Sequence, residues 1–420
     1  MIKKHSPNYR WYVLGLAALS YAFIAGAARM CMPVLFKEIG TNLNLSATAI
    51  GTVWGMDPLA GVFIGLPAGL LADRFGVKRT LVVLSIMAGI LGAVRGFSVN
   101  FFTMALTMFF FGLMAAAIPS VIPKVTIEWF SGKRLALANA ITNVAWSMGA
   151  IGASMTAATF VSPWLGGWRN TLFFFGAPAF LLGILMLFTL RDPGKDDLPA
   201  ASPYEPAANQ VPFKEAITHV IKIKEVWLVG FITLTTWGCS MGFIGYLPYY
   251  LQNKGWSAAG ASSVITVFNL LMLIGSIPMV LLSDKLKTRK GVVLLSLLAM
   301  AIGVPLIPFA SITGVWVLAV IIGFLRSGAG SLFNVMILET KGVGSLYGGT
   351  ATGLASAVSM VGAAIAPPLG NSLKSFGQAW PFIFWGLLCA LGIPLLFAIK
   401  TAKSNAKEPY KVAEGEIEPS

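Results

Sequence analysis

The sequence predicts an all-helical membrane protein with twelve transmembrane helices in two pseudo-symmetric six-helix halves. Three observations lead to this fold class. Of the 420 residues, 56% are hydrophobic and only 11% are charged, and a single soluble core could not bury so much apolar surface. Apolar segments of about 20 residues, the length that crosses a bilayer, recur along the chain. One polar segment then divides these spans into two groups of six.

The predicted spans follow one another with short polar connections. The first group covers 11–35, 47–71, 80–97, 101–122, 135–161 and 171–190. The second covers 226–251, 258–282, 292–309, 315–337, 348–373 and 381–399. Residues 191–225 are hydrophilic and rich in proline, which favours a cytoplasmic linker over one regular helix. We therefore expect an N-terminal half (1–190), a linker (191–225), a C-terminal half (226–400) and a disordered cytoplasmic tail (401–420).

Basic residues are distributed unevenly between the two sides of the predicted membrane. The formal net charge is +14, and most lysines and arginines fall in the termini, the linker and alternate loops. The opposite side holds only Lys37, Arg95, Arg169, Lys254 and Lys374. The positive-inside rule therefore places both termini in the cytoplasm of a prokaryotic cell, with the chain in its inner membrane. No aromatic-interleaved basic patch indicates nucleic-acid binding.

A short charged hairpin follows the second span. In the run Gly-Leu-Leu-Ala-Asp-Arg-Phe-Gly-Val-Lys-Arg, the characteristic residues are Gly69, Asp73, Arg74, Gly76, Lys78 and Arg79. This spacing resembles the cytoplasmic loop between the second and third helices of the major facilitator superfamily of secondary transporters. The resemblance extends over 11–399 and implies two parallel six-helix halves related by an axis along the membrane normal.

The hairpin has a physical role that its residues suggest. A glycine at position 76 permits a tight corner, and Asp73 is expected to pair with a nearby basic residue or face a helix end. A charge cluster of this kind can form and break as the halves rock, so we interpret the hairpin as a conformational latch. The alternative is that these residues are only membrane-flanking charges.

The two halves share landmarks that indicate an internal repeat. Asp73-Arg74 corresponds to Asp284-Lys285, each at the end of the second span of its half, and Trp168 corresponds to Trp380 at the last outer loop.

Small residues recur at every fourth position in two spans. They are Gly61, Gly65 and Gly69 in the second span and Gly349, Gly353 and Ala357 in the eleventh. Such seams let helix backbones approach closely. The family resemblance implies that these two helices meet between the halves, so we expect a sliding contact there. A static seam within one half is the alternative.

Three charged residues, Arg29, Asp57 and Arg326, lie inside the predicted spans, where an unpaired charge is costly. Arg29 and Asp57 lie at similar depth and are expected to pair. The resemblance implies that helices one, four, seven and ten line a central cavity, which places Arg29 and Arg326 on cavity helices of opposite halves. Two guanidinium groups suit a carboxylate, so we favour a small organic anion as substrate. Alternatively, Arg29 only neutralises Asp57, and Arg326 bonds backbone carbonyls, Ser327 or Asn334.

Other polar and aromatic residues in the spans are weaker candidates for contact with the substrate. They are Tyr21, Asn143, Trp146, Trp237, Tyr246, Asn269 and Asn334, which offer hydrogen bonds or an aromatic wall. Each has the alternative of simple packing or lipid contact. Lys124 and Arg95, near helix ends, are expected to snorkel toward the membrane surface.

The sequence leaves the coupling mode open. Asp57 is the acidic residue deepest in the spans, and a buried carboxylate can carry a proton, which would allow symport. An arginine partner would instead keep it ionised, and exchange against a counter-anion is equally admissible.

Rival functions are a proton-coupled multidrug or neutral-solute transporter of the same fold, and a membrane sensor that does not transport. Drug exporters of the family usually carry a glycine-proline motif in the fifth helix, and residues 146–153 contain no proline. A sensor would predict an appended signalling domain, and the sequence shows none.

The scattered Cys31, Cys239 and Cys389 have no metal-ligand spacing, and no phosphate-binding loop occurs. We therefore expect no enzyme activity, no catalytic residue, no cofactor and no metal, and a monomer in the lipid bilayer.

Overall fold

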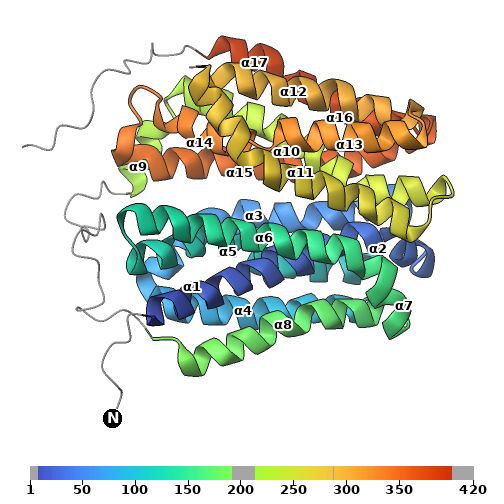
Figure 1. Ribbon diagram of the computed structural model, residues 1–420, viewed down its shortest axis with the longest axis horizontal. Coiled ribbons are helices and arrows are strands. Elements are labelled where there is room, and N and C mark those ends of the chain that lie inside the picture. Colours follow the sequence, from blue (N-terminus) through green and yellow to red (C-terminus); the bar gives the residue numbers. More distant parts are fainter. Residues whose placement is uncertain (1–7, 192–212, 287, 400–420) are drawn as a thin grey trace, which may run out of the picture.

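Helices of the computed structural model run side by side along its long axis (Figure 1). The structure describes residues 8–191, 213–286 and 288–399, and in these ranges it contains helices but no strands. Twelve helices of the described part are long and apolar enough to cross a membrane. The predicted all-α membrane fold is therefore confirmed, although most of the predicted linker and the predicted tail lie outside the described residues.

The first six spans form one half of the molecule. Spans one and five contain short π-helical segments, and span three ends in a 3-10 turn. The elements are α1 (Tyr9–Ser20), η1 (Tyr21–Ala27), α2 (Ala28–Asn42), α3 (Ala47–Phe75), α4 (Val77–Val94), η2 (Arg95–Phe97), α5 (Phe101–Trp129), α6 (Gly132–Thr156), η3 (Ala157–Val161), α7 (Ser162–Leu165) and α8 (Trp168–Thr189).

The last six spans form the other half, preceded by a short helix at the end of the predicted linker. Span ten is broken into two helices. The elements are α9 (Phe213–Val220), α10 (Lys224–Asn253), α11 (Ala258–Lys285), α12 (Arg289–Leu306), η4 (Ile307–Phe309), α13 (Ile312–Arg326), α14 (Ala329–Leu338), α15 (Gly344–Ser372), η5 (Leu373–Phe376), α16 (Trp380–Ala390) and α17 (Gly392–Ala398).

Short polar side chains start several of the spans. Ser46, Ser257 and Ser311 each accept a hydrogen bond from a backbone N–H in the first turn of α3, α11 and α13. Asn100 and Thr103 form a reciprocal capping box at the start of α5. These caps satisfy N–H groups that a helix cannot satisfy itself, and they fix where the polar loops give way to membrane-spanning helix.

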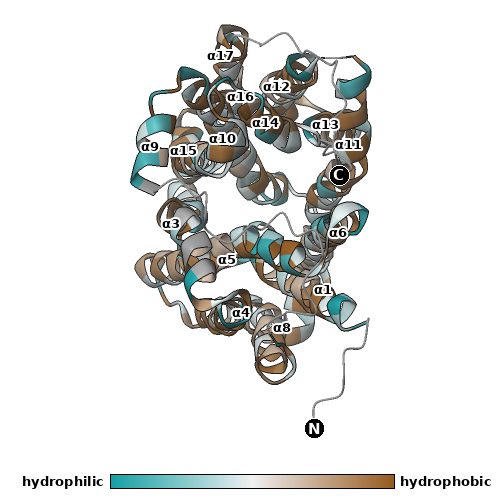
Figure 2. Ribbon diagram, turned by 90° about the vertical axis from the view of Figure 1, so that its left-hand side faces the viewer, coloured by the Kyte–Doolittle hydropathy of each residue, from teal (hydrophilic) through white to brown (hydrophobic). Residues whose placement is uncertain are grey.

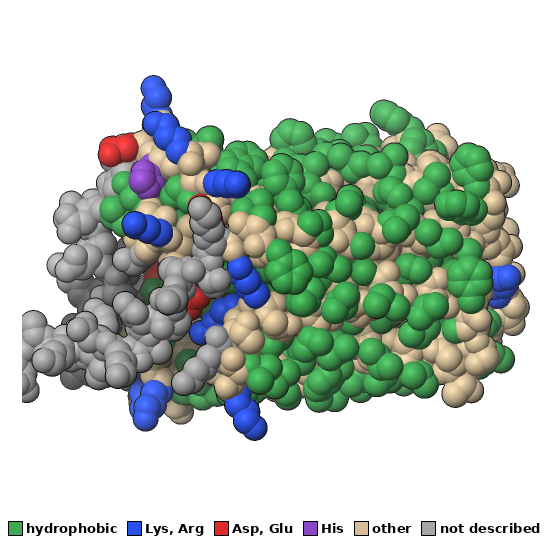
Figure 3. All heavy atoms as spheres, turned by 90° about the horizontal axis from the view of Figure 1, so that it is seen from above, with side chains coloured by type: hydrophobic (Ala, Val, Ile, Leu, Met, Phe, Trp, Pro, Cys, Tyr) green, Lys and Arg blue, Asp and Glu red, His purple; other side chains and the backbone are tan. Residues whose placement is uncertain are grey.

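The surface shown in Figure 3 is a broad band of hydrophobic side chains with lysines and arginines gathered toward one end. Large apolar side chains such as Phe188, Phe63 and Ile277 are mostly exposed, which only a lipid environment accommodates at low cost. The chain is therefore a multi-pass membrane protein.

Hydrogen bonds between the two halves lie toward one end of the bundle. We call the end where α8 ends and α10 begins the linker end, and the opposite end the far end. Viewed from the linker end, α3 borders α15 and α6 borders α11 (Figure 2). Five hydrogen bonds between described residues join the halves, and all lie toward the far end: Lys37 to Gln252 O, Gln252 to Val34 O, Trp54 to Met241 O, Asn371 to Ala47 O, and Ser154 with Thr266.

The α3 and α15 helices pack together as predicted, but they use the predicted glycines unevenly. A Cβ atom added at Gly61 would lie 3.3 Å from the sulfur of Met360 on α15, whereas one added at Gly65 or Gly349 would meet nothing within 4 Å. The closest approach lies nearer the far end, where a Cβ on Gly55 would be 2.2 Å from the Ala364 carbonyl oxygen. A glycine pattern shows that close approach is possible, but the tilt of the helices decides which glycines use it.

The turn between α3 and α4 consists of Gly76 alone, with φ +84° and ψ 150°. The predicted corner glycine is thus confirmed. The side chain of Asp73 lies outside the described residues, and Arg74 lies over the Phe75 ring with Cζ 5.5 Å from its centroid. The latch role of this hairpin stays a prediction.

Replacing Gly76 by alanine is expected to lower the melting temperature of the detergent-purified protein. A side chain at this positive φ costs about 1–2 kcal/mol, whereas Gly15, a helical glycine with open space around it, should tolerate alanine. The measurement is thermal unfolding of both variants. Equal melting temperatures for the two would show that the turn carries no strain.

Candidate functional site

Arg29 lies at an irregular point of the first span. The π-helical segment η1 ends at Ala27, two residues before Arg29, and Pro33 follows within α2. Because proline has no backbone N–H, the carbonyl of Arg29 loses its normal helical partner. Single π-helical turns are common at functional sites, and here one sets the direction in which Arg29 leaves the helix.

Arg29 and Asp57, which the sequence suggested as a pair, form an ion pair between α2 and α3. The Nε atom of Arg29 donates to Oδ2 of Asp57. The Asp57 side chain is fully buried, whereas that of Arg29 is 15% exposed. Among the described residues, the two terminal nitrogens of Arg29 have no hydrogen-bond partner, so the planar end of the guanidinium remains available.

Arg326 lies at a second irregular point, on the opposite half. It is the last residue of α13, and span ten breaks at Ser327 and Gly328 before α14. Its Nε donates to the Ser240 hydroxyl at 2.7 Å, and its guanidinium carbon lies 5.2 Å from the centroid of the Trp237 ring. Broken helices often line binding sites in transporters.

The charge of Arg326 has no carboxylate partner in the described part of the chain. The residue is only 6% exposed, and besides Ser240 and Trp237 its contacts include the sulfur of Met272 at 3.8 Å. The alternative partners suggested by the sequence are not used, because Ser327 donates to Phe324 O and Asn334 is exposed. A buried cation without a counter-ion is costly and marks a place where an anion would be stabilised.

The remaining predicted residues lie in different surroundings. Near η1, the rings of Tyr21 and Trp146 lie 6.5 Å apart, and Trp146 donates to Ala25 O at 3.2 Å. Asn269 is buried and its side-chain nitrogen has no partner, while Asn143 is exposed.

Tyr246 lies elsewhere than the two arginines. It is 2% exposed and packs in an aromatic cluster with Tyr249, Tyr250, Phe382 and Trp385. In the described part of the chain it has no hydrogen bond or ring contact with either arginine. Its role as a substrate contact remains a prediction.

Arg95 is the residue that sequence reasoning misjudged. The snorkelling prediction is wrong, since Arg95 is 0% exposed and its side chain turns into the N-terminal half. It donates to the carbonyls of Gly92 and Ala28 and lies over the ring of Phe111. A position near a helix end suggested the membrane surface, and only the tertiary structure shows that its side chain turns inward.

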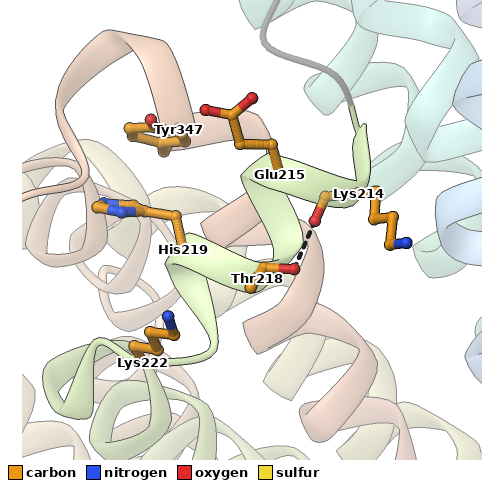
Figure 4. Close-up of a pocket in the computed structure, with 6 residues that line it drawn as sticks. All are labelled: Lys214, Glu215, Thr218, His219, Lys222 and Tyr347. Carbon is orange, nitrogen blue, oxygen red and sulfur yellow. Dashed lines mark hydrogen bonds between the residues drawn. The ribbon is translucent and has the colours of Figure 1, made fainter.

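A surface pocket at the linker end is separate from these residues (Figure 4). His219 of α9 stacks on Tyr347 of α15, with ring centroids 4.2 Å apart, and its Nε2 lies 2.8 Å from Gly342 O. Lys214 and Lys222 point in different directions (Figure 4). These contacts hold α9 against α15 and do not build a convergent binding site.

Comparison with known proteins identifies the family of the chain. It is 26% identical over 406 residues to the cis,cis-muconate transport protein of Acinetobacter baylyi, covering 93% of this chain and 95% of that protein. It is 25% identical over 388 residues to the gentisate transporter of Corynebacterium glutamicum, covering 88% and 83%. Among solved structures, a variant of the nucleoside transporter NupG matches with a TM-score of 0.74 at 14% identity, covering 93% of this chain and 98% of that one.

The sequence profile described as Major Facilitator Superfamily matches residues 18–339 and 226–419. This family and the named relatives are transporters and not enzymes. The chain therefore belongs to the major facilitator superfamily.

Proposed function

We propose that this protein moves a small organic anion, of the carboxylate class, across the cytoplasmic membrane by alternating access. The observation that carries the proposal is Arg326, a buried arginine with no carboxylate partner among the described residues. An anionic substrate would supply the missing negative charge. The uneven distribution of basic residues supports an orientation with both termini in the cytoplasm.

Arg29 supports the same proposal from the other half. Each arginine lies beside an irregular point of its helix, and each is held through Nε by a side chain of its own half. In both cases at least one terminal nitrogen has no hydrogen bond in the described part of the chain. Such a pair could bind the two ends of a dicarboxylate, or one carboxylate and a polar group. Relatives named as transporters of cis,cis-muconate, gentisate and galactarate or glucarate are in keeping with this class.

Alternating access is supported by where the halves touch. Their hydrogen bonds gather toward the far end, so substrate release toward the linker end would require no break in these contacts. Transport would then require the far-end contacts to open. Proton symport and anion exchange both remain compatible with Asp57, whose Oδ1 is buried without a hydrogen-bond partner.

Thermal stabilisation of the detergent-purified protein tests the proposed substrate class, because a ligand that binds the folded state raises apparent stability. We expect cis,cis-muconate, D-glucarate or gentisate to raise the melting temperature, and a hundredfold excess over Kd corresponds to about 2.7 kcal/mol. Matched neutral probes are the corresponding methyl esters. Stabilisation by esters or cationic drugs, and not by any carboxylate, would overturn the anion proposal in favour of the multidrug or neutral-solute alternative.

A further inference from the structure

We propose that Arg95 is a positioning residue for the anion site, acting on Arg29 through the main chain and on Asp57 through its charge. The inference rests on the proposed function. Arg95 contributes the net positive charge that the Arg29–Asp57 pair lacks. Arg95 also holds, by a hydrogen bond, the backbone from which Arg29 projects.

The contacts of Arg95 reach its own span and two other spans of the N-terminal half, the first and the fourth. Its Nε donates to Gly92 O at 3.0 Å, Nη2 donates to Ala28 O at 2.8 Å, and Nη1 lies 3.7 Å from the sulfur of Met108. The guanidinium carbon is 3.9 Å from the centroid of the Phe111 ring. All of these acceptors are neutral, so they satisfy its hydrogen bonds without cancelling its charge.

The bond to Ala28 acts directly on the first span. Ala28 is the residue before Arg29, at the junction of η1 and α2, where the π segment on one side and Pro33 on the other weaken the regular hydrogen-bond ladder. A carbonyl held from a neighbouring helix fixes such a junction. The direction of the Arg29 side chain therefore depends on a bond made by the third span.

Arg95 and Asp57 lie close together on either side of the fourth span. The Arg95 guanidinium lies over the ring of Phe111, and a Cβ atom added at the next residue, Gly112, would be 2.7 Å from the Cα atom of Asp57. The charge of Arg95 therefore also acts on Asp57. The Arg29–Asp57 pair alone is neutral and offers an anion no net attraction. With Arg95, two positive charges face one negative charge, and the group keeps a net charge of +1 while Asp57 stays ionised. An anion can then bind Arg29 without first displacing or protonating Asp57.

Arg95 is not itself a substrate contact. It is fully buried, and each of its three nitrogens has a partner within the protein. Its effect should therefore appear in the affinity for anions and depend on the total charge of the group, which a purely structural role would not require.

The test is a charge-balance series measured as Kd for cis,cis-muconate, D-glucarate and gentisate by titration of the purified protein. Arg95→Gln makes the group neutral. It should raise Kd at least about tenfold, because the variant loses the Coulomb attraction between one nearby positive charge and the anion. Arg95→Lys keeps the charge and should lose less. Asp57→Asn with Arg95→Gln returns the group to +1 and should recover much of the affinity.

The controls separate charge from folding. Arg169→Gln removes an arginine that bonds Asn42 and Ser98 at the far end, and it should leave Kd unchanged. If Arg95→Gln fails to fold, Asp57→Asn alone decides, because a net charge of +2 predicts retained or tighter binding and a loss of binding by folded protein contradicts it.

Each result bears on a different claim. A double variant that binds more weakly than Arg95→Gln would show a structural role and overturn the charge assignment, as would unchanged affinity in Arg95→Gln. Both of these outcomes leave the proposed function intact. If the wild-type protein binds none of the three anions, the proposed function fails as well.

Discussion

Arg326→Gln is expected to abolish uptake of the carboxylate substrate, with a loss in kcat/KM of more than about a hundredfold. Removing one partner of a buried charge pair costs about 2–5 kcal/mol, and the structure offers the substrate no other cation at this break in span ten, within the described residues. Uptake of labelled cis,cis-muconate, D-glucarate or gentisate into proteoliposomes measures the effect.

Two further variants sharpen this prediction. Ser240→Ala removes the side chain that holds Nε of Arg326 and should reduce uptake less, because the charge remains. Arg289→Gln is the matched control, since Arg289 pairs with Asp284 and Glu339 at the linker end and should transport normally. Uptake with unchanged KM in Arg326→Gln would remove Arg326 from the site and leave the anion class without its main support.

Most of the fold could be predicted from the sequence because lipid imposes simple rules. Span length and hydrophobicity follow from the thickness of the bilayer, and all twelve predicted spans correspond to helices. Irregularities inside the spans were not predictable. The π segment at Tyr21–Ala27 and the break after Arg326 depend on how neighbouring helices satisfy the freed backbone groups, and single-sequence hydrophobicity carries no such information.

The charged members of the candidate site could be picked out from the sequence because charge itself is the signal. Arg29, Asp57 and Arg326 stand out because charges in a span are rare. The partners of Arg326 could not be predicted, because Ser240 and Met272 lie on other spans and resemble ordinary helix residues. Arg95 was misjudged for a related reason. A residue near a helix end can turn toward water or toward the protein, and the choice depends on acceptors such as Ala28 O from a helix far away in the sequence.

Gly55→Leu is expected to prevent the contact between the halves at the far end and so to stop transport. A Cβ at Gly55 would lie 2.2 Å from the carbonyl oxygen of Ala364 on α15, and a helix backbone cannot move aside as a side chain can. Overpacking of this kind costs about 1–3 kcal/mol or more, which shifts the population away from the closed far end roughly ten- to hundredfold. Uptake should fall with it, because alternating access requires both conformations.

Cross-linking at the far end distinguishes this effect from misfolding. The Lys37 side chain donates to the backbone carbonyl of Gln252 across the halves. Cysteines that replace these two residues should be joined readily by a short bifunctional thiol reagent in otherwise unchanged protein, and poorly when Gly55→Leu is also present. Gly65→Leu on the same helix is the matched control, because nothing lies within 4 Å of the added Cβ, and it should cross-link normally. If Gly55→Leu cross-links and transports like the parent, α3 and α15 do not need this close approach, and the far-end contact cannot be the barrier that alternates.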